Sequence, residues 1–396
     1  MNLSASFRAF ASFRAFFRSE SASAILVFLA AAIAFLLANS PFGSLYTHLR
    51  ELPIGLPVVG SKTLEHWVAD GFMALFFLLV GLEIKRERIA GELVDTQKAL
   101  LTVFAAVGGM LCPAIVYALF NPSGLGARGW GIPMATDIAF ALGALSLLGK
   151  RIPTNLKVFL TALAVVDDLG AIVVIALFYT VSLNWVLLSC AFLTWLITLG
   201  VAHLKVRTLW PYGILGFVLW ILILKSGLHA TIAGVLLAFA IPLRVSGRSE
   251  MSLQELDQVS LFHRLEHRLA PWVGYLILPI FAFFNAGVKV GGAGFGPISV
   301  GVFLGLFLGK PLGILGFSWL VLRFRWARLP EGVRWVHLFG AGCLAGIGFT
   351  MALFIGYLAF GPSAELEEAK RAIIIASVVS AIVGMGILRF GVLDKR

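Results

Sequence analysis

Two adjacent aspartates, Asp167 and Asp168, lie in the middle of a strongly apolar segment, residues 155–180. Because about 20 apolar residues are enough for a helix to cross a bilayer, this segment is long enough to span a membrane. A charged side chain at that depth costs roughly 2.5–3.5 kcal/mol on insertion scales, so two neighbouring carboxylates need a compensating role. The pattern predicts an ion or proton site that faces the interior of a helix bundle. The alternative is a structural pair that neighbouring groups neutralise.

A lone cation, Lys310, lies in the middle of another apolar segment, residues 303–316. An ammonium group at membrane depth needs a carboxylate or exposed carbonyl groups beside it, and the central position argues against a lysine that reaches the interface. We expect Asp167 to be its partner. Successive helical residues point about 100° apart, so Asp167 and Asp168 cannot both face Lys310. We therefore expect the second carboxylate to face a cavity.

Two further apolar segments carry features that interrupt a helix. Pro133 precedes Thr136 and Asp137 in residues 129–143, and a proline removes one backbone donor and clashes with the preceding turn. Residues 344–356 contain Gly346 and Gly348. Broken backbone at membrane depth is tolerated where it is buried in protein or lines a cavity. A proline-kinked structural helix and close-packing glycines are the alternatives, but interrupted helices at matching positions of two repeats indicate a transporter site.

Broken helices also generate electrostatic fields in the membrane. A half-helix has a partial positive charge at its N-terminus and a partial negative charge at its C-terminus. Asp137 and Lys310 have the right signs to compensate these charges. The clustered carboxylates repel one another and so bind protons more readily, while Na⁺ or Li⁺ prefers oxygen ligands. A proton and a cation that compete for the same oxygens, combined with alternating access, suffice for antiport.

Other ionisable residues lie near the ends of the apolar segments. Asp70 follows the start of one segment and is a candidate for a cavity mouth. His229 is a candidate packing histidine. A second group is expected on the cytoplasmic side, either as a titrating cluster, since histidine changes charge near neutral pH, or as a solvated face; it contains Glu83, Glu87, Glu266 and His267.

The composition identifies an integral membrane protein. Of 396 residues 60% are hydrophobic and only 13% are charged, whereas soluble domains have about 25% charged residues. The apolar runs are continuous rather than alternating, so helices are expected and not a barrel. Phosphate-binding loops, paired metal-binding histidines and nucleophile elbows are absent from the sequence, so we expect no enzyme and no cofactor. The cysteines at 112, 190 and 343 lie in apolar runs without metal-ligand spacing.

The sequence predicts twelve transmembrane segments. They lie at about 21–39, 67–84, 99–120, 129–148, 155–180, 185–203, 210–225, 228–243, 271–288, 296–322, 335–360 and 370–391. An even number places both termini on one side. With this assignment 23 of the 31 Lys and Arg residues share the side of the termini and 7 lie opposite, which predicts cytoplasmic termini. This asymmetry also accounts for the net charge of +11 without nucleic acid.

Two connecting regions are distinctive. Residues 1–20 repeat the string SFRAF and alternate Arg with Phe, which is typical of an interfacial helix on an anionic membrane; the basic start of a signal peptide is the alternative. Residues 50–62 alternate apolar residues with Pro and Gly after the first segment. This pattern predicts a short β-hairpin outside the bilayer.

Several strings resemble the NhaA family of bacterial sodium/proton antiporters. The similarity extends over nearly the whole chain and is carried by GLEIKRE, ATDIAFALG, LTALAVVDDLGAI, SGLHATIAGV, LEHRLAPWV, LPIFAFFNAGV and LAGIGFTMALFI. The link between paired broken helices and transport sites is known partly from this same family, so the two breaks are not independent support for the resemblance. The Phe- and Arg-rich start is not part of the resemblance.

The resemblance implies a fold and a set of roles. It implies inverted repeats with crossed, broken fourth and eleventh helices, and an electrogenic exchange of Na⁺ or Li⁺ for more than one proton. Asp168 and Asp167 match the cation and proton carboxylates, Lys310 matches the partner of Asp167, and Asp137 and Thr136 match the crossing. Positions tied to pH response match a further set, Glu83, Glu87, Glu266, His267 and His229. The resemblance also implies a homodimer with the hairpin at its contact.

The sequence thus predicts a single all-α antiporter domain in the bacterial inner membrane. We expect a core bundle at about 99–180 and 296–391, an interface part at about 21–98 and 185–288, and anionic lipid such as cardiolipin as a partner, with no organic substrate. A sodium-coupled symporter for an organic anion would need a larger pocket. A cation channel would not explain two broken helices, and an intramembrane enzyme is a further, weaker alternative.

Overall fold

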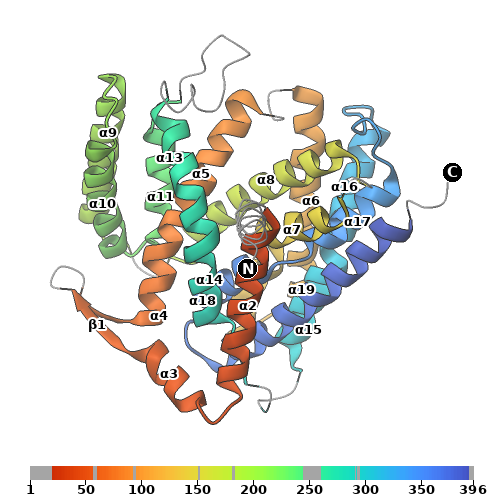
Figure 1. Ribbon diagram of the computed structural model, residues 1–396, viewed down its shortest axis with the longest axis horizontal. Coiled ribbons are helices and arrows are strands. Elements are labelled where there is room, and N and C mark those ends of the chain that lie inside the picture. Colours follow the sequence, from red (N-terminus) through yellow and green to blue (C-terminus); the bar gives the residue numbers. More distant parts are fainter. Residues whose placement is uncertain are drawn as a thin grey trace, which may run out of the picture.

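The computed structural model is a bundle of long helices with one small sheet (Figure 1). It describes residues 20–391 apart from 57–59, 92–94, 150–151, 181–182, 244–259, 290 and 292–294. The expected interfacial segment, apart from its last residue, lies outside the described residues. Within them, eight helices are long and apolar enough to cross a membrane, or up to eleven spans if each of three bent pairs counts as one. With one shorter apolar helix, α11 (Thr231–Ala240), this agrees with the fold class of about twelve helices.

Eight spans run through the bundle without a sharp bend. Five of them are single helices: α6 (Thr96–Phe120), α8 (Thr154–Phe178), α9 (Trp185–His203), α10 (Leu209–Ser226) and α19 (Ala364–Phe390). The other three each contain a π-helical turn between two α-helices: α4 (Leu64–Trp67), η1 (Val68–Phe72) and α5 (Met73–Ala90); α13 (Leu261–Trp272), η5 (Val273–Ile277) and α14 (Leu278–Asn285); and α15 (Pro297–Leu304), η6 (Gly305–Gly309) and α16 (Lys310–Arg323). Such turns often mark functional sites, and Asp70 and Lys310 lie in or next to two of them.

Three helix pairs are bent at a short break. The 3₁₀-helix η3 (Gly126–Met134) meets α7 (Ile138–Leu147) at 40°, and α17 (Trp335–Ala345) meets α18 (Phe349–Phe360) at 45°. The two interruptions predicted from the sequence are therefore confirmed. The third pair, α2 (Glu20–Ala38) and α3 (Gly43–Glu51), is bent by 115°, so α3 turns away from the span before it. The sequence analysis assigned residues 43–51 to a connection and missed α3.

A β-hairpin follows α3, as the alternating pattern predicts. Its strands β1 (Pro53–Leu56) and β2 (Gly60–Thr63) pair antiparallel, with Ile54 opposite Lys62. The hairpin, α3 and the start of α4 lie together at one end of the bundle, which we call the hairpin end (Figure 1). The opposite end contains the last turns of α5 and the first turns of α13.

Three predicted boundaries are wrong. The second span was expected to end at 84, but its helix continues to Ala90. The ninth span was expected to begin at 271, but its helix begins at Leu261, and the twelfth begins at Ala364 rather than at 370. Pro271 lies inside the helix, two residues before the π-helical turn begins at Val273, and membrane helices tolerate such prolines. Ser363 caps α19 by accepting a hydrogen bond from the backbone N–H of Leu366.

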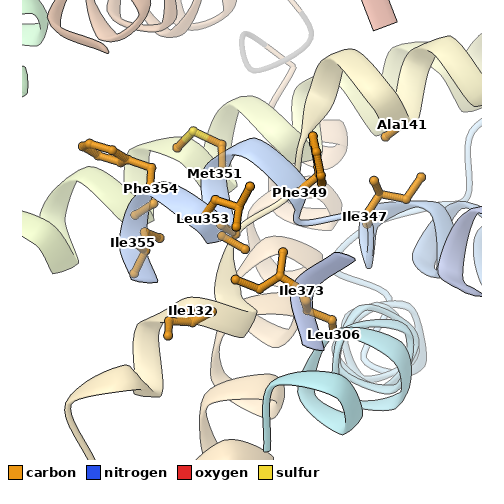
Figure 2. Packing of buried hydrophobic residues seen from close by; sticks show 14 of the residues in the cluster. Ile132, Ala141, Leu306, Ile347, Phe349, Met351, Leu353, Phe354, Ile355 and Ile373 are labelled. Carbon is orange, nitrogen blue, oxygen red and sulfur yellow. The ribbon is translucent and has the colours of Figure 1, made fainter. Parts of the chain in front are cut away.

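Close backbone contacts hold several helices together. α6 packs along α16, and a side-chain methyl on Gly313 would collide with the carbonyl oxygen of Gly108. Small residues at such contacts let membrane helices approach closely. Apolar side chains fill the space around the two broken helices: Figure 2 shows Ile132, Leu306, Ile347 and Phe349 among this group. The breaks therefore lie inside protein and not against lipid.

The contact between α6 and α16 predicts opposite outcomes for two glycines on one helix. Gly313→Ala places a methyl group against backbone that cannot move aside, so we expect a loss of about 1–3 kcal/mol in stability. Gly316→Ala meets nothing within 4 Å, and it should be neutral or gain up to about 1 kcal/mol from helix propensity. Thermal unfolding of both purified variants in detergent checks this. Equal melting temperatures for the two would contradict the packing described.

Candidate functional site

The two broken helices cross and satisfy each other's free backbone groups. The hydroxyl of Thr136 donates to the carbonyl oxygen of Ala345 at 2.9 Å, and the N–H of Asp137 donates to the carbonyl oxygen of Ile347 at 2.6 Å. Both acceptors belong to the last turn of α17 or to the break after it. A methyl group on Gly346 would approach the carbonyl oxygen of Leu306 to 2.5 Å, so glycine is needed where the chains pass so closely. The hydrogen bonds across the crossing therefore compensate the backbone groups that both breaks leave unpaired, where no water is available to do so.

The carboxylate of Asp137 caps both half-helices that begin at the crossing. One oxygen accepts from the N–H of Phe140 at 3.2 Å in the first turn of α7. The other accepts from the N–H of Thr350 at 2.9 Å and from the hydroxyl of Thr350 in α18. Two helix N-termini with partial positive charge therefore face one buried carboxylate. With three donors, Asp137 serves as the compensating anion, and it has little capacity left to bind a cation.

Lys310 has the corresponding role at the negative end of a half-helix. Its ammonium group donates to the carbonyl oxygen of Met134, the last residue of η3, and lies 2.5 Å from Oδ2 of Asp167. Both side chains are buried, at 1% and 2% relative exposure. The structure therefore brings together Lys310 and Asp167, as their positions in the sequence predict. Thr136 also lies close to Asp167, although its hydroxyl donates to Ala345.

Asp168 is the carboxylate with the fewest partners at the crossing. Its side chain is buried, and it interacts electrostatically with Asp167, Asp137, Glu83 and Lys310. Oδ1 of Asp168 and Oδ1 of Asp167 are both buried without a hydrogen-bond partner among the described residues. A buried polar atom left unpaired costs roughly 1–3 kcal/mol, and more for a charged group. Two such oxygens on adjacent residues form a site that suits a proton or a small cation.

The donor set fits a weakly bound alkali cation better than a permanent metal. In the part of the chain that the structure describes, no three His, Cys, Asp or Glu residues gather into a metal-ligating group. Na⁺ or Li⁺ at Asp167 and Asp168 would need hydroxyl, backbone or water oxygens to complete its shell, and Thr136, which lies close to Asp167, offers a hydroxyl. A proton needs only one of the unpaired oxygens.

Asp70 lies in η1 near the hairpin end, where its carboxylate is paired. It is buried, and its carboxylate pairs with Lys62 at 3.1 Å and with His66 at 2.9 Å. Its backbone carbonyl accepts from the indole of Trp220 at 3.1 Å. The structure thus gives Asp70 a set of partners at the hairpin end.

At the opposite end, three of the four cytoplasmic candidates lie close together. Glu266 of α13 pairs with Arg86 of α5, and Glu87 lies 3.7 Å from the same arginine. Glu83, one turn earlier on α5, interacts electrostatically with this cluster. His267 is different: it is exposed, and His263 approaches Glu266 at 3.6 Å instead. Residues three apart share a helix face, so His263 was recognisable only once α13 was known to begin before it.

His229 has a structural contact. Its Nε2 atom lies 2.9 Å from the carbonyl oxygen of Tyr179, which joins the start of α11 to the end of α8. The Tyr179 hydroxyl in turn donates to the carbonyl oxygen of Arg128 and accepts from the N–H of Gly131. This arrangement matches the interpretation as a packing histidine. Tyr179, Thr350 and the Met134 carbonyl are site components that the sequence analysis did not assign.

Comparisons with known proteins agree on one family. The family model described as Na⁺/H⁺ antiporter 1 matches residues 14–388. The chain is 47% identical to the Na⁺/H⁺ antiporter NhaA of Nitrobacter hamburgensis over 391 residues, covering 96% of this chain and 92% of that protein. It is 48% identical to the proteins of the same name from Shewanella sediminis and Rhodospirillum rubrum, covering 93% and 94% of this chain and 92% and 96% of those proteins.

The buried Lys310–Asp167 pair predicts a strongly coupled stability effect. Lys310→Met alone leaves a buried carboxylate without its cation, so we expect a loss of roughly 3–5 kcal/mol, and a similar loss for Asp167→Asn alone. The double variant removes both charges and should be more stable than the sum of the single losses predicts. Thermal unfolding of the three variants checks this. Additive losses would show that the two side chains do not depend on each other.

Proposed function

Because the chain belongs to the Na⁺/H⁺ antiporter 1 family, we propose that it exports cytoplasmic Na⁺ or Li⁺ in exchange for external protons, with more than one proton per cation. The printed names of its relatives are those of transporters, and its many apolar helices make it a multi-pass integral membrane protein. The observation that carries the finer proposal is the pair of unpaired, buried oxygens on Asp167 and Asp168. If the two aspartates had only a structural role, we would expect each of their buried oxygens to accept a hydrogen bond.

Proton and cation would compete at this pair. With a proton on each carboxylate, both buried negative charges are removed and Lys310 is released from its ion pair with Asp167, while it keeps the carbonyl oxygen of Met134. Na⁺ offers the same neutralisation through direct bonds to the two free oxygens, but only after the protons have left. Because two carboxylates can carry two protons and bind one Na⁺, the exchange would move net charge across the membrane. Both loaded states avoid a bare buried carboxylate, which favours transport by a site that is never empty.

Alternating access requires that the site open to each side in turn. We assign the movement to the core bundle, residues 99–180 and 296–391, which contains the crossing, Lys310 and the aspartate pair. The interface part, residues 21–98 and 185–288, would stay fixed. Within the core, α6 packs along α16 and α15 along α19, whereas α5 packs along α11 and α9 along α10 in the interface part. Because α2 of the interface part also packs along α7 of the core, the movement of one body against the other would slide these two helices past each other.

The remaining elements of the proposal concern regulation and surroundings. We assign pH regulation to the cluster of Glu83, Arg86, Glu87, Glu266 and His263, because these charged side chains of α5 and α13 lie together at the end opposite the hairpin. We further propose a homodimer that pairs through the hairpin, and bound anionic lipid. The protein would lie in the inner membrane with both termini in the cytoplasm, which follows from the distribution of Lys and Arg.

The exchange assay in everted vesicles tests the assignment. Adding Na⁺ or Li⁺ should dissipate a proton gradient across a pH series, and K⁺ should not. Asp168→Asn should abolish this response, because the amide can neither release a proton nor bind a cation with a negative charge. Glu51→Gln, an acid-to-amide change at an exposed position of α3, is the matched control and should behave as the unmodified protein. Exchange by the Asp168→Asn variant at the normal rate would refute the site.

A further inference from the structure

A network of charged and hydroxyl side chains lies at the hairpin end, apart from the aspartate pair. Glu65 of α4 accepts two hydrogen bonds from the Arg50 guanidinium of α3, at 2.7 and 3.3 Å. The next residue, His66, contacts Asp70 and Lys62 at 2.9 and 2.6 Å. The hairpin, α3, α4 and η1 are thus joined through their side chains. None of these residues takes part in the exchange site.

Two contacts connect this network to helices of the core bundle. Nδ1 of His66 lies 2.9 Å from the hydroxyl of Tyr357 in α18, and the ammonium group of Lys370 in α19 lies 3.8 Å from Oε1 of Glu65. α18 is the second half of the broken helix, and Tyr357 lies two turns beyond Thr350, on the same helix face. A displacement of the crossing that moved α18 as a unit would therefore move Tyr357. Lys370 has 0% relative exposure, so its charge cannot be left alone.

The distances show that the contacts between the network and the core helices can break without leaving a buried charge unpaired. Lys370 has a second carboxylate on its own helix, Glu367, at 3.2 Å, and Glu65 keeps Arg50 at 2.7 Å. The contact between the two bodies, at 3.8 Å, is longer than either pair within one body. His66 likewise keeps Lys62 and Asp70 on its own side. Separation would therefore leave each buried ion with a partner, which a permanent structural clamp does not require.

We propose that the Glu65–Lys370 and His66–Tyr357 contacts form a latch that closes the hairpin end of the exchange path. The latch is engaged in the conformation described, and it must open each time the aspartate pair becomes accessible from that end. The inference rests on the proposed alternating-access exchange. It assigns to Lys370 a positioning role: the lysine binds no transported ion, but holds α19 against α4 while the site faces the opposite end.

Reversible cross-linking across the latch tests the proposal. In a chain whose cysteines at 112, 190 and 343 are replaced by serine, Glu65→Cys and Lys370→Cys are joined with a short bis-methanethiosulfonate reagent. The matched control joins Arg50→Cys and Glu65→Cys, a pair that shares one of the two positions but lies within a single body. Exchange of Na⁺ for protons is measured in proteoliposomes before cross-linking, after it, and after release with a reductant.

We expect the 65–370 cross-link to abolish exchange and the reductant to restore it, while the 50–65 cross-link leaves the rate unchanged. Full exchange with the 65–370 positions joined would overturn the latch, because the contact would then never open. Equal loss from both cross-links would also overturn it, since the effect would be general damage. If the 65–370 variant does not fold, His66→Cys with Tyr357→Cys bridges the same interface. Failure of the unmodified protein to exchange Na⁺ would instead count against the proposed function.

Discussion

The structure depends on one constraint: a charge buried among membrane helices persists only when an opposite charge or dipole lies against it. Asp137 meets this condition through the N-termini of α7 and α18, and Lys310 through the carbonyl of Met134 and the carboxylate of Asp167. Asp168 is the exception, because among the described residues its carboxylate has no ion pair of the kind that Lys310 gives to Asp167. The crossing therefore uses its dipoles and its lysine to neutralise the fixed charges. It leaves Asp168, which we propose is neutralised by a proton or by a cation.

The same constraint connects the site to the proposed movement. Backbone breaks are expensive in lipid, yet here the hydroxyl of Thr136 and the N–H of Asp137 use the free carbonyls of the other chain. The two broken helices are thus held as one unit, and both pack against α8, which carries the aspartate pair. At the hairpin end, Lys370 and Glu65 each keep a partner within their own body, so their contact can open and close. Charge compensation thus fixes what moves together and permits what separates.

Much of this arrangement was accessible from the sequence, because intramembrane charges and interrupted helices are rare and costly. The aspartate pair, the isolated Lys310 and the two breaks were predicted because such features are rare inside a membrane. The hairpin was predicted from its alternating pattern with Pro and Gly. The family resemblance supplied part of the assignment. The predictions that failed concern helix boundaries and contacts between residues on different helices. The start of α13 at Leu261 and the helix α3 were missed because Pro271 and the polar residues after the first span read as boundaries. His263, not His267, contacts Glu266, and Lys370 lies far along the chain from Glu65. Such pairings depend on tertiary packing that no sequence pattern encodes.

The central claim is that proton and Na⁺ occupy the same oxygens and exclude each other. Isothermal titration of the purified protein with Na⁺, repeated in two buffers of different ionisation enthalpy, counts the protons released for each cation bound. The account predicts proton release on binding, together with an affinity for Na⁺ that weakens as the pH falls and the carboxylates fill with protons. Binding of Na⁺ without proton release, at an affinity that is the same at every pH, would contradict it.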